Sequence, residues 1–486
     1  MPESHSKESS TMSVLEVLQR VARPLGDAVR VDSAEAVRVS DRSALAGRME
    51  RLARTAALGS EPDASVARWL IRAVAAEIGV FPASIDPLYR ARGRGETRND
   101  FTVPAMNLRA LAFHSARAVF RAAQSTDAKA VVFEIARSEM GYTAQRPSEY
   151  SASVLAAAVA EGHSGPVFIQ GDHFQVGAKR FADHAVKEVD ALRSLIGEAV
   201  EAGFFNIDID TSTLVDLTPR TLEEQQQLNV ILCAELSQEV RRREPRGVTI
   251  SIGGEIGEVG GRNSTEAELR AFMDGYNRTF ARLQPGSAGL SKISIQTGTS
   301  HGGVVLPDGS IADVKVDFET LRQLSEVARR AYGLAGAVQH GASTLPEEAF
   351  VRFAEAGACE VHLATNFQNM LFDRLPEGLR KEMYTFLDTN YAAERKSGMT
   401  DEQFYYKVRK NSIGPFKKAL WGLPDDVLGT LGGAWEKQFR LLFERLGITG
   451  TRAEVDRFVK GPVVRPRMAS YLKGTGLETD IRDLAD

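Results

Sequence analysis

One short stretch of the sequence runs from an apolar segment directly into residues that could do chemistry. Residues 167–169 are apolar, and they lead through Gln170 and Gly171 to Asp172 and His173. A short β-branched and aromatic run is typical of a strand that is buried in a parallel sheet. The functional groups of parallel-sheet folds lie just beyond the carboxyl ends of the strands. Asp172 and His173 are therefore the first candidates for a catalytic or ligand-binding role.

Polar residues stand in the same place after other apolar runs. Three of the eight histidines, His173, His301 and His340, follow such runs and have glycines close by. A catalytic site of the zinc type combines neutral imidazoles with a carboxylate and leaves one position open to substrate. These histidines and Glu255, which also follows an apolar run, are the predicted ligands of a divalent metal. The other polar residues in such positions are Asn107, Asp210, Ser212 and Thr365.

Asp172 has two interpretations at this point. It could hold a metal-binding histidine in place, as such histidines commonly require. It could instead exchange a proton with substrate, and its position directly before His173 favours this role only if the strand is ending there. Gly302 and Gly341, beside His301 and His340, leave backbone N–H groups accessible, as the binding of a phosphate requires.

The spacing of the apolar runs predicts the fold that positions these residues. Eight short runs alternate with longer helical patterns, and eight parallel strands are the number that closes a (β/α)8 barrel. The gaps are long enough for right-handed crossovers, with helices predicted at 190–201 and 318–331. The alternative is an open doubly wound sheet, but no GxGxxG follows the first strand. The predicted strands are 103–106, 130–135, 167–169, 204–209, 248–252, 293–296, 337–339 and 361–364.

The segments on either side of the barrel have a different pattern. We expect a disordered tail at 1–11, an all-helical extension at 12–95, the barrel at 96–374 and a second helical extension at 375–486. Apolar residues recur at helical spacing in both extensions. The C-terminal helices are predicted at 379–391, 401–410, 415–420, 428–446 and 453–459.

Composition narrows the class of ligand. The 60 basic and 64 acidic residues give a net charge of −4 without a basic stripe, which argues against nucleic acid or an anionic membrane as partner. No apolar run is long enough to span a membrane. The two cysteines, Cys233 and Cys359, form no disulfide framework and are expected to be buried. We therefore expect a cytoplasmic protein with a small ligand.

Taken in order, these motifs resemble those of the class II (zinc-dependent) ketose-bisphosphate aldolases. The resemblance covers roughly residues 99 to 370 and neither extension. Any one of these motifs is weak evidence for the family, but seven motifs in the same order at strand ends are specific evidence. The segments that carry it are 101–107, 172–173, 209–212, 255–257 with the glycine pair 260–261, 299–302, 340–343 and 364–365.

The resemblance implies a role for each matching residue. It makes His173, Glu255, His301 and His340 the ligands of Zn²⁺ or another divalent transition metal. Asp172 matches the aspartate that exchanges a proton with the substrate hydroxyl. The implied cradle of the triose phosphate is Gly302, Gly341, Ser343 and Thr365, and Asn107 and Asp210 match polar residues of the barrel mouth. A metal that stabilises an enediolate makes a lysine Schiff base unnecessary.

Three positions depart from the family pattern. The serine of the second-strand segment is absent if residues 133–136 are the matching segment, and Arg137 and Ser138 just beyond it could bind an anion instead. The glutamate that handles the proton on the triose carbon is absent, because residues 262–264 are Arg, Asn and Ser. Glu258 is the expected replacement, and Glu266 is the alternative. His362 stands where the family has an asparagine, so the contact with phosphate or enediolate is expected to differ there. Lys410, Lys417 and Lys418 in the C-terminal extension are candidates for reaching a second phosphate, although surface lysines are more often solvated.

These inferences predict a metal-dependent aldolase that cleaves or forms a phosphorylated ketose in carbohydrate metabolism such as glycolysis. The expected partner is a phosphorylated sugar, and the expected assembly is a homo-oligomer, either a dimer or a tetramer. Two alternatives stay open. The chain could be a non-catalytic, aldolase-like partner subunit, or it could be a metal-dependent sugar isomerase or epimerase.

Overall fold

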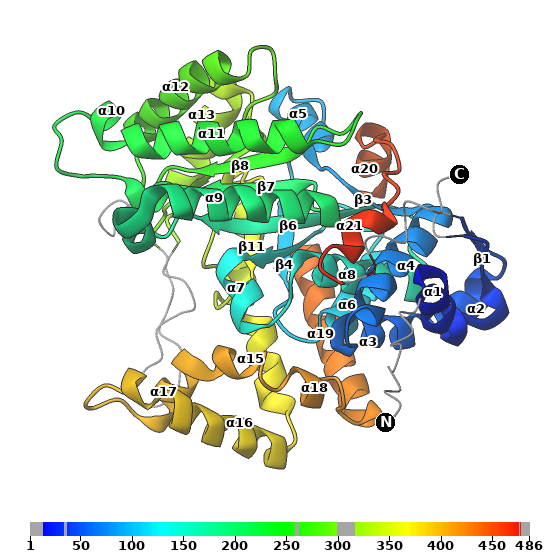
Figure 1. Cartoon of the computed structure of the whole chain (residues 1–486). Coiled ribbons are helices and arrows are strands. Elements are labelled where there is room, and N and C mark those ends of the chain that lie inside the picture. The colour runs from blue at the N-terminus through cyan, green and yellow to red at the C-terminus, as the bar shows by residue number, and fades with distance from the viewer. Residues whose placement is uncertain (1–12, 34–35, 258–261, 299–315, 476, 478–486) are drawn as a thin grey trace, which may run out of the picture.

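Eight parallel strands close into a barrel in the computed structural model (Figure 1). The structure describes residues 13–33, 36–257, 262–298, 316–475 and 477. The strands neighbour one another in chain order, and the last pairs with the first, which confirms the (β/α)8 barrel and excludes the open sheet. They are β4 (Val103–Asn107), β5 (Val132–Ala136), β6 (Gly165–Gln175), β7 (Asn206–Asp210), β8 (Ser251–Glu255), β9 (Lys292–Ile295), β10 (Ala337–Gln339) and β11 (Glu360–Leu363).

Helices connect the barrel strands and cover the barrel from outside. The helices predicted at 190–201 and 318–331 are confirmed as parts of α9 and α13. The connecting helices are α6 (Ala112–Ser125), α7 (Arg137–Tyr142), α8 (Pro147–Ala160), α9 (Ala178–Ala202), α10 (Leu222–Gln225), α11 (Gln227–Arg243), α12 (Glu266–Leu283), α13 (Phe318–Tyr332) and α14 (Val351–Glu355). Within the described ranges, no helix is both long and apolar enough to cross a membrane. Cys233 and Cys359 are buried, as expected.

Strand β6 continues past the point where the apolar run ends. Its pairing with β7 shifts register between Gly171 and Phe174, and His173 has a left-handed φ of 41°. A non-glycine residue at positive φ is uncommon, and an irregularity of this kind re-aims side chains. Asp172 and His173 therefore both line the cavity at the barrel mouth, although neighbours on a regular strand point to opposite faces.

The N-terminal extension is mainly helical, but the prediction that it is entirely helical was wrong. Two three-residue strands, β1 (Val29–Val31) and β2 (Val37–Val39), form an antiparallel pair. A third, β3 (Val80–Ala83), joins β6 in parallel at its N-terminal half. These runs are too short to show a period, and β3 contains Pro82, a residue that breaks regular patterns but is tolerated in an edge strand. The helices are α1 (Val14–Ala22), α2 (Arg42–Ala46), α3 (Met49–Leu58), α4 (Asp63–Glu77) and α5 (Asp86–Gly93).

The C-terminal extension is helical, as predicted. Two of its helices, α16 and α17, lie together at one end of the barrel (Figure 1) and share a small core of Leu387, Phe404 and Val408. The helix α19 packs on α6 and α15 along the barrel wall. After α15 (Thr365–Arg374), which ends the barrel, the helices of the extension are α16 (Glu377–Asn390), α17 (Asp401–Val408), α18 (Lys417–Leu420), α19 (Asp425–Arg445), α20 (Arg452–Phe458) and α21 (Met468–Leu472).

The interior of the barrel contains a buried lysine. The ammonium of Lys292 on β9 donates to Gln170 Oε1 at 2.8 Å and to Asp208 Oδ2 at 3.0 Å, and it pairs with Glu360. The Tyr89 hydroxyl from α5 donates to the second oxygen of Glu360. Burial alone would lower the pKa of Lys292, but Asp208 and Glu360 raise it above its usual range. The lysine is therefore a permanent cation that joins strands β6, β7, β9 and β11.

Gly253 on β8 makes room for this ion pair. It lies opposite Asp208 on one side and opposite Lys292 on the other. A Cβ at this position would collide with the Asp208 carboxylate and would stand only 3.0 Å from Lys292 Cε. The glycine is required by this close approach, not by an unusual backbone angle.

Removal of the buried ammonium should destabilise the fold. We expect Lys292→Met to lower the free energy of unfolding by about 3–5 kcal/mol, because Asp208 and Glu360 would lose their counter-charge inside the barrel. Lys473→Met is the matched control, since Lys473 pairs with Glu201 at 2.9 Å at the surface and should cost at most about 1 kcal/mol. Denaturant unfolding measures both, and equal losses would contradict the structural role of Lys292.

Candidate active site

A cavity of about 680 Å³ opens at the carboxyl ends of the barrel strands. Its lining includes eight barrel residues of the predicted site and, from the C-terminal extension, Lys410. Strand β6 supplies Asp172 and His173, the segment after β10 supplies His340, Gly341 and Ser343, and Asn107, His362 and Thr365 come from β4, β11 and the start of α15. The barrel thus brings together residues that are up to 258 positions apart (365 − 107) in the chain.

Three of the predicted metal ligands lie together at this mouth. One ligand atom from each of His173, Glu255 and His340 falls within 4.8 Å of the others. The rings of His173 and His340 are 4.3 Å apart between centroids. His173 Nδ1 lies 3.1 Å from Asp210 Oδ2 and 3.4 Å from Glu255 Oε2. Asp210 therefore orients the imidazole, as a carboxylate often does for a metal-binding histidine.

The charges at this cluster favour a bound cation. Burial and the neighbouring Asp210 raise the pKa of Glu255 to about 7. Burial alone would lower the pKa of His173, but Asp172, Glu255 and the hydrogen bond with Asp210 raise it well above its usual range. Protons on Glu255 and His173 thus offset the negative charge of the neighbouring carboxylates. A divalent ion would replace those protons, and two imidazoles with one carboxylate suit zinc, cobalt or iron.

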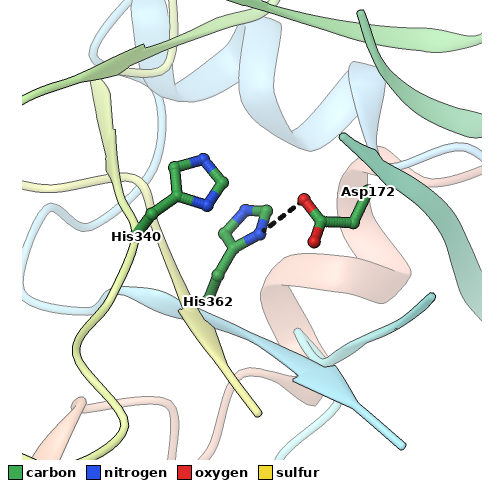
Figure 2. Close-up of side chains that lie close together, drawn as sticks. All are labelled: Asp172, His340 and His362. Carbon is green, nitrogen blue, oxygen red and sulfur yellow. Dashed lines mark ion pairs between the residues drawn. The ribbon is translucent and has the colours of Figure 1, made fainter. Parts of the chain in front are cut away.

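Two other groups of residues have the composition of a metal site, and both contain His362. One is Asp172, His340 and His362 (Figure 2), and the other is Asp208, Glu360 and His362. His362 Nδ1 lies 3.2 Å from Asp172 Oδ1, and Nε2 lies 2.8 Å from Glu360 Oε1. Both ring nitrogens thus face carboxylates and carry protons, whereas a metal ligand needs a lone pair. The second group is also neutralised by Lys292.

His362 is a cation, in contrast to the neutral asparagine of the family pattern. Burial alone would lower its pKa, but Glu134 and Asp172 raise it well above the usual range. Figure 2 shows its ring between His340 and the Asp172 carboxylate. His362 therefore fixes Asp172 at the cavity wall and links it to the charged interior of the barrel.

The remaining predicted residues are only partly described. His301, Gly302 and Glu258 lie outside the described residues. Asn107 Nδ2 donates to Glu139 Oε2 at 2.7 Å, and Ser343 Oγ accepts from the Ala364 N–H at 2.7 Å. Glu266 begins α12 and pairs with Arg270 on the exposed face of that helix, and it is absent from the cavity lining.

Several residues of the cavity were not found from the sequence. Helix α17 contributes Gln403, Tyr406 and Lys407 to its wall. The turn after α17 adds Lys410, which the sequence did indicate, whereas Lys417 pairs with Glu149 instead. Lys410 Nζ lies 5.5 Å from the centre of the Tyr142 ring. The helical spacing of α17 was visible in the sequence, but the place where this helix packs was not. The other residues that the sequence reading missed are Arg109, Glu134, Glu139, Tyr142 and Gln368.

Comparison with known proteins assigns a family. Residues 95–419 match the family model described as "Fructose-bisphosphate aldolase class-II". No curated protein sequence matches the chain. The fructose-bisphosphate aldolase of Campylobacter jejuni is 17% identical, with a TM-score of 0.45, 77% of this chain and 96% of that chain covered. A "probable tagatose 6 phosphate kinase" of Sinorhizobium meliloti 1021 is 15% identical, with a TM-score of 0.49 and coverage of 78% and 99%.

The position of the metal can be tested by two substitutions at the mouth. Glu255→Gln should lose stoichiometric metal, because it replaces an anionic ligand with a neutral amide. His362→Asn should retain the metal, since the nitrogens of His362 are occupied by carboxylates. Elemental analysis of the purified variants gives the metal content, and thermal unfolding controls for folding. Metal retained in Glu255→Gln but lost in a folded His362→Asn would place the ion between Asp172, His340 and His362 instead.

Proposed function

The chain belongs to the class II fructose-bisphosphate aldolase family, and from this premise we propose that it cleaves and forms a phosphorylated ketose by metal-dependent aldol chemistry. The observation that carries the proposal is the cluster of His173, Glu255 and His340, whose two histidines line the same cavity as Asp172. Family membership supplies the reaction class, and the cluster supplies the groups that the reaction needs.

Different residues would bind the metal and accept the proton during cleavage. His173, Glu255 and His340, with His301 as the fourth predicted ligand, would hold the metal. The bound ion would supply Lewis-acid stabilisation of the negative charge that develops on the ketone oxygen. The Asp172 carboxylate, held by His362, would accept the proton of the hydroxyl at the bond that breaks. No lysine Schiff base is required, and Lys292 is fully engaged by Asp208 and Glu360.

The phosphate of the substrate would bind at the segment that follows β10 and at the start of α15. Gly341 has a left-handed φ of 72°, and it lines the cavity with Ser343 and Thr365. Thr365 is the first residue of α15, and the N-terminus of a helix presents unpaired N–H groups to an anion. Lys410, from the turn after α17, adds a positive charge to the lining of the cavity. These groups support a phosphorylated substrate.

The activity is tested by a screen of ketose monophosphates and bisphosphates in an assay coupled to triose release. We expect turnover of at least one bisphosphate that a chelator abolishes and that added zinc, cobalt or iron restores. Conversion of a sugar without triose release would favour the isomerase alternative. A metal-loaded, folded protein that turns over none of these sugars would favour the non-catalytic partner subunit.

A conservative substitution distinguishes a catalytic role of Asp172 from a role in metal binding. Asp172→Asn should retain metal and fold but lose about 10²-fold or more in kcat, the usual scale of general acid–base catalysis. Asp456→Asn is the control, since Asp456 on α20 pairs with Lys129 and is absent from the cavity lining. Loss of bound metal in Asp172→Asn would show instead that this carboxylate supports the ligands.

A further inference from the structure

Glu134 on β5 is a buried carboxyl at the cavity that the proposed mechanism does not yet use. It is 1% exposed and contributes to the lining of the same cavity as Asp172 and His173. It was passed over in the sequence because it lies inside an apolar run, between Phe133 and Ile135. A carboxyl is almost never fully buried unless it is paired or functional.

The two oxygens of Glu134 have very different surroundings. Oε2 lies 3.0 Å from His362 Nδ1 and accepts from Gln170 Nε2 at 3.1 Å. Oε1 is buried and has no hydrogen-bond partner among the described residues. A buried oxygen without a partner is costly. The arrangement is consistent with a neutral carboxyl whose Oε2 accepts from Gln170 and lies beside the His362 imidazole, and whose Oε1 carries the proton.

The charges around Glu134 favour a carboxyl that holds its proton to a much higher pH than an exposed glutamate does. Asp172 on β6 and Glu360 on β11 face it as anions, while His362 on β11 faces it as a cation. Burial and Asp172 raise the pKa of Glu134 to about 7, and His362 offsets part of that shift. A carboxyl that titrates close to neutral pH can both give and take a proton during turnover.

We propose that Glu134 is the acid–base residue that handles the proton on the triose carbon, in place of the glutamate that the loop after β8 lacks. The inference rests on the proposed aldolase function. It rests on geometry as well, because Glu134 lines the cavity that Asp172 also lines, and its Oε1 makes no hydrogen bond within the described part of the chain. Asp172 thus handles the proton of the substrate hydroxyl, and Glu134 handles the proton on the triose carbon.

The proton transfers balance with the substrate, the two carboxyls and water alone. Asp172 takes the hydroxyl proton as the carbon–carbon bond breaks, and the aldehyde product leaves. The electron pair of that bond remains on the triose fragment as an enediolate, and Glu134 gives the proton on Oε1 to its carbon. Asp172 then releases its proton to water, and the Glu134 carboxylate regains one from water. In the direction of synthesis, the Glu134 carboxylate removes the proton from the triose carbon.

The test is the exchange of the carbon-bound proton of dihydroxyacetone phosphate with solvent deuterium, followed by NMR on the metal-loaded protein. Unmodified protein should exchange this proton, and Glu134→Gln should lose the exchange by about 10²-fold or more while it retains metal and fold. The amide is a close match in shape to the neutral carboxyl. If Glu134→Gln does not fold, Glu134→Asp supplies the same comparison, since it keeps a carboxyl but withdraws it by one methylene.

The loop carboxylates serve as matched variants. Glu258→Gln and Glu266→Gln should keep the exchange. Exchange that survives in Glu134→Gln, or that is lost only in Glu258→Gln or Glu266→Gln, would overturn the assignment of Glu134 alone. An unmodified, metal-loaded protein that neither cleaves a ketose bisphosphate nor exchanges this proton would contradict the aldolase function and, with it, the role of Glu134.

Discussion

The ion pairing of Lys292 inside the barrel is the interaction on which the arrangement of the site depends. A parallel barrel normally fills its interior with branched apolar side chains, but here β6, β7, β9 and β11 place Gln170, Asp208, Lys292 and Glu360 there. Each of these groups would be expensive to bury alone. Only the closed ring of strands brings them within hydrogen-bonding distance, so the charges and the closure of the barrel support each other.

His362 connects this charged interior to the cavity. One ring nitrogen faces Glu360, and the other faces Asp172 and Glu134. The histidine that departs from the family pattern therefore orders both carboxyls that the mechanism uses, one for the hydroxyl proton and one for the carbon proton. The loop glutamate of the family and this pair of buried residues are two ways to place a carboxyl near the same carbon. Above them, Asp210 and Glu255 give the mouth a negative charge that a divalent ion would balance.

The sequence predicted the barrel because each strand is an apolar run with a polar residue at its carboxyl end, and it predicted the mouth because histidines and glycines follow those runs. It could not predict which residues inside the runs face the interior. Glu134, Asp208 and Lys292 look like single interruptions of apolar segments, and their partners come from strands far away in the chain. It also missed β3, whose four residues contain a proline, and the side chains of α17, whose helical period does not say where the helix packs.

The central claim is that His173, Glu255 and His340 hold a divalent metal at the barrel mouth. X-ray absorption spectroscopy at the metal edge of the loaded protein tests this claim directly, because it reports the ligand atoms around the ion. The account predicts a shell of nitrogen and oxygen ligands at about 2.0–2.2 Å, with at least two imidazoles and with one imidazole fewer in His340→Ala. A sulfur shell, or an imidazole count that His340→Ala leaves unchanged, would contradict it.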